Sequence, residues 1–315
     1  MKFSPHAFGF LFFTLASISF VQAGYYYDST LEPMVESYVD LLERTADDNW
    51  ASLSPEKRDQ CEKRYAGILN DGVIDIRIAL GYFDAFDGKA LDPAAREALH
   101  DGLVAKCRGT ARFCGFKEFS GGVYSKQVHI QGRPYTARIE MHSAAVTDQT
   151  SKNQGRNRSE QLQRTAFLEN FYSAALQNAD AVFYFGHSRN GGGPDFSPPV
   201  LDSHGKPDYS GYYLPRKPGY RLMERALSGS LTQAKVIGMM SCDSKDHFLK
   251  KIRPMAPQSG VIYSLAVMPL THPYTAMVGG VDGLLRGKCG GYHKSLRMTP
   301  GNEQYISMDG MFERL

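Results

Sequence analysis

The spacing of hydrophobic positions changes along the chain near residue 120. Before that point, apolar residues such as Met34, Tyr38 and Leu41 recur at the three- and four-residue intervals of a helix face. Ser54-Pro55 places a capping residue directly before a proline, as at the start of a helix. These patterns predict a helical N-terminal region over residues 24–120.

After residue 120 the apolar runs are short, and most of them alternate with helical patterns. Segments 124–130 and 135–142 flank a short turn and predict a β-hairpin. The elements predicted after it are a helix at 159–178, a strand at 181–185, a helix at 220–227, a strand at 235–240, a helix at 246–252, a strand at 261–267 and a helix at 271–285. Such alternation predicts right-handed βαβ units. We therefore expect an α/β domain at 121–315, a three-layer sandwich with a mainly parallel sheet.

The first 23 residues have the features of a cleavable signal peptide. Lys2 is followed by an almost wholly apolar stretch at 7–20, and small residues at 21–23 suit signal peptidase. The apolar stretch is too short and too weakly flanked for a stable membrane span, and no later stretch is long and apolar enough. We expect an exported protein, periplasmic or extracellular.

The overall charge argues against two classes of partner. A net charge of +3 is too small to favour binding to nucleic acid or to an acidic membrane surface. We expect no nucleic-acid partner and no cofactor. The sequence does not determine the oligomeric state.

The chain contains five cysteines, which are Cys61, Cys107, Cys114, Cys242 and Cys289. Export favours disulfides, and an odd number leaves at least one cysteine unpaired within the chain. Cys242 is least suited to pairing because it follows a predicted buried strand. We expect a bridge among Cys61, Cys107 and Cys114, which share one N-terminal region, with the connectivity left open.

Two of the predicted strands run directly into side chains with catalytic chemistry. The strand at 181–185 leads into Gly186-His187-Ser188, and the strand at 235–240 leads into Ser241-Cys242-Asp243. The carboxyl ends of parallel strands gather reactive groups at one edge of a sheet. An imidazole titrates near neutrality and can accept a thiol proton, and N–H groups at a strand-to-helix junction favour a thiolate. The sequence therefore predicts a His187–Cys242 catalytic dyad.

These two motifs resemble those of the caspase-like cysteine peptidases, the caspase–hemoglobinase fold that includes caspases, legumains, gingipains and separases. The resemblance covers residues 121–290. His187 precedes Cys242 by about 55 residues, close to the roughly 50 residues described for caspases. The resemblance implies an endopeptidase acting on a peptide or protein substrate. His187 would be the general base and acid, Cys242 the nucleophile, and the backbone N–H groups of Ser188 and Cys242 the oxyanion hole.

The segments next to the two motifs are candidates for substrate contact. Gly191 and Gly192 follow His187 and are expected to let a substrate approach the backbone. A long loop at 202–220, rich in tyrosine and glycine, is expected to form a substrate wall or lid.

Two residues at the motifs depart from what the family resemblance leads us to expect. The family usually has glycine where this chain has Ser188, and Asp243 places a charge beside the Cys242 thiol.

Acidic residues near the motifs suggest one further contact with substrate. Asp195, Asp202 or Asp243 would pair with an Arg or Lys side chain of a substrate.

Three other functions are compatible with the same residues. A caspase-like domain without activity would be a binding module. Residues 186–190 nearly match the nucleophile elbow of serine hydrolases, with Ser188 as nucleophile, but Asn190 replaces the last glycine and the glycines beyond it oppose a helix. A zinc site would need ligands from His187, Cys242, His204 and His247, which lack the paired spacing of such sites, so we expect no metal.

Overall fold

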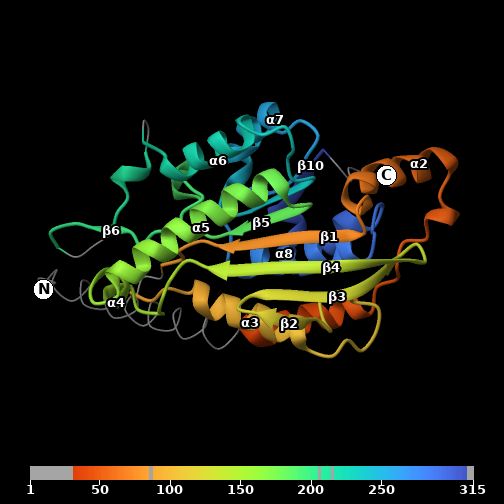
Figure 1. Cartoon of the computed structure of the whole chain (residues 1–315), viewed down its shortest axis with the longest axis horizontal. Coiled ribbons are helices and arrows are strands. Elements are labelled where there is room, and N and C mark those ends of the chain that lie inside the picture. The colour runs from red at the N-terminus through yellow and green to blue at the C-terminus, as the bar shows by residue number, and fades with distance from the viewer. Residues whose placement is uncertain (1–30, 85–87, 205–206, 214–215, 311–315) are drawn as a thin grey trace, which may run out of the picture.

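The computed structural model describes residues 31–84, 88–204, 207–213 and 216–310 (Figure 1). The predicted signal peptide at 1–23 lies outside these residues. The strands are β1 (Val73–Leu80), β2 (Lys117–Ser120), β3 (Val123–Ile130), β4 (Arg133–Ser143), β5 (Ala181–Phe185), β6 (Val200–Leu201), β7 (Pro207–Asp208), β8 (Val236–Met240), β9 (Gly260–Ser264) and β10 (Ile306–Asp309).

The helices lie before, between and after these strands. Residues 31–43 are helical, and the further helices are α2 (Pro55–Leu69), α3 (Asp92–Val104), α4 (Thr150–Gln154), α5 (Arg158–Asn178), α6 (Pro218–Ser228), α7 (Lys250–Met255), α8 (Thr271–Leu285), α9 (Tyr292–Ser295) and α10 (Asn302–Tyr305). Short turns of other helix types are η1 (Trp50–Ser52), η2 (Arg189–Gly191), η3 (Ser210–Tyr212) and η4 (Lys245–Leu249). None of the helices in the described residues combines the length and apolar character needed to cross a bilayer.

Eight of the strands form one mixed sheet in the order β10-β9-β8-β5-β1-β4-β3-β2. The consecutive strands β9, β8, β5, β1 and β4 are parallel, whereas β10 and the β3 and β2 strands at the other end pair antiparallel. The expectations of an α/β fold and a mainly parallel sheet are therefore confirmed. The predicted hairpin is β3–β4, and the predicted helices at 159–178 and 271–285 are α5 and α8.

Strand β1 corrects the prediction of a helical region over residues 24–120. It lies between β5 and β4, near the centre of the sheet (Figure 1). Its isoleucines Ile74, Ile76 and Ile78 are fully buried, and they alternate with the half-buried Asp75 and Arg77. This two-residue period is that of a strand with one polar face. The sheet thus takes strands from both sides of residue 120.

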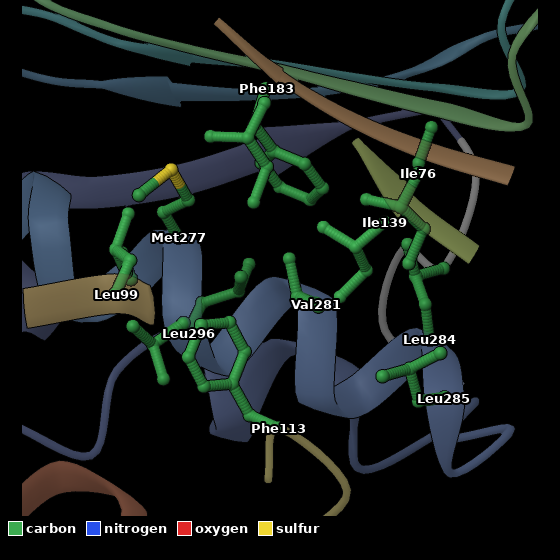
Figure 2. Close-up of a cluster of buried hydrophobic side chains, with 14 of the residues drawn as sticks. Ile76, Leu99, Phe113, Ile139, Phe183, Met277, Val281, Leu284, Leu285 and Leu296 are labelled. Carbon is green, nitrogen blue, oxygen red and sulfur yellow. The ribbon is translucent and has the colours of Figure 1, made fainter. Parts of the chain in front are cut away.

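Helices cover both faces of the sheet and define two hydrophobic clusters. One cluster joins the sheet to α2, α3 and α8, and the other joins it to α5, α6 and α7. Figure 2 shows Phe183 of β5 and Ile76 of β1 facing Met277 and Val281 of α8. This packing fixes β5 and β1, the two strands that lead to the candidate site.

Two disulfides stabilise the fold. Cys107 is bonded to Cys114, which confirms a bridge within the N-terminal trio. Cys61 of α2 is bonded to Cys289, 228 residues away, a pairing that the sequence did not indicate. Cys242 is a free cysteine, as predicted.

Candidate active site

The structure brings the two predicted catalytic motifs to one edge of the sheet. Strands β5 and β8 are parallel neighbours, and Phe185 lies opposite Met240 in their register. His187 lies two residues after Phe185, and Cys242 lies two residues after Met240. The Gly186 N–H donates to the Met240 carbonyl at 3.3 Å, which continues the pairing one residue beyond β5.

The backbone at His187 is held by a buried tyrosine of the same strand. The Tyr184 hydroxyl donates to the His187 carbonyl at 2.8 Å and accepts from the Asp195 N–H at 2.9 Å. Gly186 is required beside it, because a Cβ at that position would lie 2.6 Å from the Tyr184 oxygen. The turn after β5 is therefore fixed by a hydroxyl within the core.

The imidazole of His187 is held from the end of β1. Its ring stacks on Phe83 with the centroids 4.3 Å apart and the planes within 10°. Nε2 lies 3.3 Å from the Asp84 carbonyl oxygen and 3.5 Å from its carboxylate Oδ1. The side chain is still 29% exposed, so the ring is held from one side and open on another.

A buried network of charges surrounds this histidine. Arg189 donates through Nη2 to Asp84 and through Nε to Asp195 at 2.8 Å, and the side chains of all three are at most 8% exposed. Arg189 has a left-handed backbone with φ of 46°, a conformation that costs an ordinary residue about 1 kcal/mol. The two ion pairs fix the segment that follows His187.

The protonation state of His187 follows from its burial and these charges. Burial lowers its pKa, and the cation of Arg189 lowers it further, while Asp84 opposes both. The imidazole is therefore neutral at neutral pH and able to accept a proton. Burial alone would raise the pKa of Asp84, but Arg189 and His187 bring it below its usual value.

A second buried carboxylate anchors the segment that supports His187. Asp92 is fully buried at the start of α3 and accepts from the N–H groups of Phe83 at 3.2 Å and Ala145 at 2.7 Å. Burial raises the pKa of Asp92 to about 7, although the backbone donors act in the opposite direction. Asp92 thus ties the stacking partner of His187 to the end of β4.

Cys242 is held differently, through the backbone around it. The thiol is partly exposed and makes no hydrogen bond within the described residues. Ser264 at the end of β9 exchanges backbone and hydroxyl hydrogen bonds with Ser244, and its hydroxyl also donates to the Ser241 carbonyl. The turn that presents the thiol is therefore attached to the neighbouring strand.

The backbone also offers the donors expected of an oxyanion hole. Within the part of the chain that the structure describes, the N–H groups of Ser188 and Cys242 donate to no acceptor. Asp243, by contrast, has a left-handed backbone with φ of 49° and donates its N–H to Ala266 at 3.1 Å. The part of the Ser188 and Cys242 N–H groups in an oxyanion hole stays a prediction.

The glycine-rich segment after His187 packs against the chain itself. Gly191 and Gly192 are buried, and a Cβ at Gly192 would collide with the Tyr212 carbonyl. A Cβ at Gly193 would lie 2.8 Å from the His187 carbonyl oxygen. The expectation for Gly192 is therefore wrong, because the close approach it allows is to protein backbone. A Cβ at Gly191 would instead meet the side chains of His247 and Lys217, so its contact with a substrate stays a prediction.

The candidate acidic contacts and the alternative nucleophile are placed as follows. Asp195 is buried in its pair with Arg189, so it is not available to a substrate cation. Asp202 is exposed in the loop after β6. Ser188 is 7% exposed and leads into the single turn η2 in place of the longer helix that a nucleophile elbow precedes.

The structure does not assemble the alternative zinc ligands. Within the described residues, the one group of three potential ligands close enough for a metal is Glu43, Cys107 and Cys114. Its two thiols are joined in a disulfide and cannot act as thiolate ligands.

Three residues of the site, Phe83, Asp84 and Arg189, were not predicted from the sequence. The alternation of isoleucines with Asp75 and Arg77 was the signal that could have found Phe83 and Asp84, because it indicates a strand ending just before them.

Comparisons with protein-family models, curated proteins and solved structures find no match to this chain.

Proposed function

We propose that the protein is a cysteine endopeptidase with a His187–Cys242 dyad. The observation that carries the proposal is the pairing of β5 with β8, whose last partners, Phe185 and Met240, are each followed two residues later by a member of the dyad. The free thiol of Cys242 and the neutral imidazole of His187 are the two states that the chemistry needs at the start.

The reaction proceeds through a covalent acyl-enzyme. His187 takes the thiol proton, and the Cys242 thiolate attacks the carbonyl carbon of the scissile peptide bond. The N–H groups of Ser188 and Cys242 donate to the oxyanion that forms. His187 then protonates the leaving amine, and water releases the acyl group while His187 accepts a proton from it.

Asp84 orients the base in this scheme. With its proton on Nε2, the imidazole donates toward the Asp84 carbonyl and carboxylate oxygens, which leaves Nδ1 as the proton acceptor for the thiol. The carboxylate also stabilises the imidazolium that forms after proton transfer. This role is that of the third member of a triad.

We also propose that the protein acts after export. The two disulfides support an oxidising compartment, where such bonds persist. The substrate there would be a peptide or protein.

The test is a peptidase assay with a broad peptide library on four proteins: the parent, Cys242→Ala, His187→Ala and the double variant. Each single change should lower turnover by several orders of magnitude, and the double variant should lose little more, because the two groups act as a unit. Equal activity in all four proteins would refute the dyad. A parent without activity would favour the binding-module alternative.

A further inference from the structure

The loop between β7 and α6 is attached to the residues that support His187. The Tyr209 hydroxyl donates to Asp84 Oδ2 at 3.0 Å. The guanidinium carbon of Arg189 lies 4.8 Å from the Tyr209 ring centroid and 5.3 Å from that of Tyr212. Two aromatic residues of one loop therefore cover a buried cation two residues beyond the proposed base.

Asp84 is the group that links this loop to the histidine. Its carboxylate is shared among three neighbours, with Oδ1 near Arg189 and His187 and Oδ2 accepting from Tyr209. Its side chain is 8% exposed, so no acceptor site on it is fully solvated. A change at one neighbour must alter the interaction with the other two, because the same charge serves all three.

We propose that Tyr209 is a positioning residue that acts on the base through the Asp84 carboxylate. This inference rests on the proposed function and adds a positioning residue to it. Tyr209 and Arg189 hold the Asp84 carboxylate in place and satisfy much of its charge, so His187 stays neutral and correctly oriented.

The charged groups that face His187 are Asp84 from the end of β1 and Arg189 and Asp195 from its own loop. The hydroxyl of Tyr209 reaches the histidine only through Asp84. Removing this hydroxyl leaves the carboxylate less satisfied, so it attracts the imidazole proton more strongly. The proton should then bind His187 more tightly.

The experiment is an NMR titration of His187 in the full chain carrying Cys242→Ala, which needs no peptidase activity. The His187 signal is identified by its loss in His187→Gln. Tyr209→Phe removes the donor to Asp84 but keeps the ring over Arg189. The matched control is Tyr213→Phe in the same loop, whose hydroxyl contacts Asn190 at 2.9 Å and not Asp84.

The inference predicts a higher titration midpoint for His187 in Tyr209→Phe and an unchanged midpoint in Tyr213→Phe. In the active protein, Tyr209→Phe should lower kcat about three- to tenfold with little change in KM, and should move the acid limb of kcat/KM to higher pH. An unchanged midpoint in Tyr209→Phe, or an equal change in both variants, would overturn the coupling. A parent without peptidase activity would refute the proposed function alone, because the titration still decides the coupling.

Discussion

The loop of His187 is held at its side chain as well as at its backbone, whereas the loop of Cys242 is held at its backbone alone. The imidazole is stacked on Phe83 and faces two oxygens of Asp84. The thiol has no hydrogen-bond partner within the described residues, and the serines beside it fix only the turn that carries it. The imidazole is therefore oriented by its own contacts, whereas the thiol is positioned only through the turn that carries it.

The difference also extends to electrostatics. Four charged or ionisable side chains, those of Asp84, Arg189, Asp195 and Asp92, support the histidine loop from buried positions. The turn at Cys242 depends instead on neutral hydroxyls. Variants on the two sides should therefore respond differently to pH.

The largest effect should come from the anchor of the histidine loop, Asp92. Its folded-state pKa is raised to about 7, so it contributes stability that is complete below about pH 4 and is lost as pH rises through 7. The free energy of unfolding should fall over this range by a component on the order of 4 kcal/mol that is absent from Asp92→Asn. Urea unfolding at several pH values measures the difference between the two proteins. Asp180, with its pKa also raised to about 7, is present in both and cancels. If the free energy of unfolding changed with pH in the same way in the parent and in Asp92→Asn, the role of Asp92 would be contradicted.

The next effect concerns orientation of the base. Asp84→Asn should lower kcat about 100-fold, because the amide cannot stabilise the imidazolium and cannot accept equally from Arg189 and Tyr209. The control is Asp101→Asn, which removes a carboxylate from the solvent-exposed end of α3. Full activity in Asp84→Asn would show that the histidine needs no carboxylate.

On the cysteine side, Ser264→Ala should lower the free energy of unfolding by a smaller amount, and this loss should not depend on pH. It leaves the Ser241 carbonyl and the Ser244 N–H without their partner, at a cost of about 1–3 kcal/mol in the free energy of unfolding. Alkylation of Cys242 should also slow severalfold. Ser259→Ala is the matched control, because Ser259 is a buried serine that donates to Ala234 at the other end of β9. It should lower stability without changing the alkylation rate, and an equal loss of rate in both variants would remove the special role of Ser264.

The smallest effect is a shift in the pH at which kcat/KM falls on the acid side of its profile. Because burial and Arg189 lower the pKa of His187, kcat/KM should fall only below the ordinary histidine value of about 6.5. The measurement uses a substrate without ionisable side chains. A limb at or above this value would mean that the imidazole is not the buried neutral base described here.

The parts predicted from sequence were those that local patterns determine. The runs 181–185 and 236–240 contain no charged residue, which is typical of strands covered on both faces, so their ends and the two catalytic candidates could be placed. Strand β1 was missed because Asp75 and Arg77 interrupt its apolar residues.

Recognising β1 would have placed Phe83 and Asp84 after a strand end, but it would not have shown that they contact His187. Phe83 and Asp84 are more than 100 residues from His187 in sequence, and only the pairing of β1 with β5 brings them together. The burial of Arg189 between two carboxylates likewise depends on tertiary packing, which residue type alone does not reveal.

The most direct test of the dyad is the rate at which iodoacetamide alkylates Cys242 at pH 7, in the parent and in His187→Ala. The other four cysteines are in disulfides, so the modification reports on Cys242 alone. If His187 accepts the thiol proton, the parent should react at least about tenfold faster than the variant. Equal rates in the two proteins would show that the two side chains do not act together, and would contradict the account.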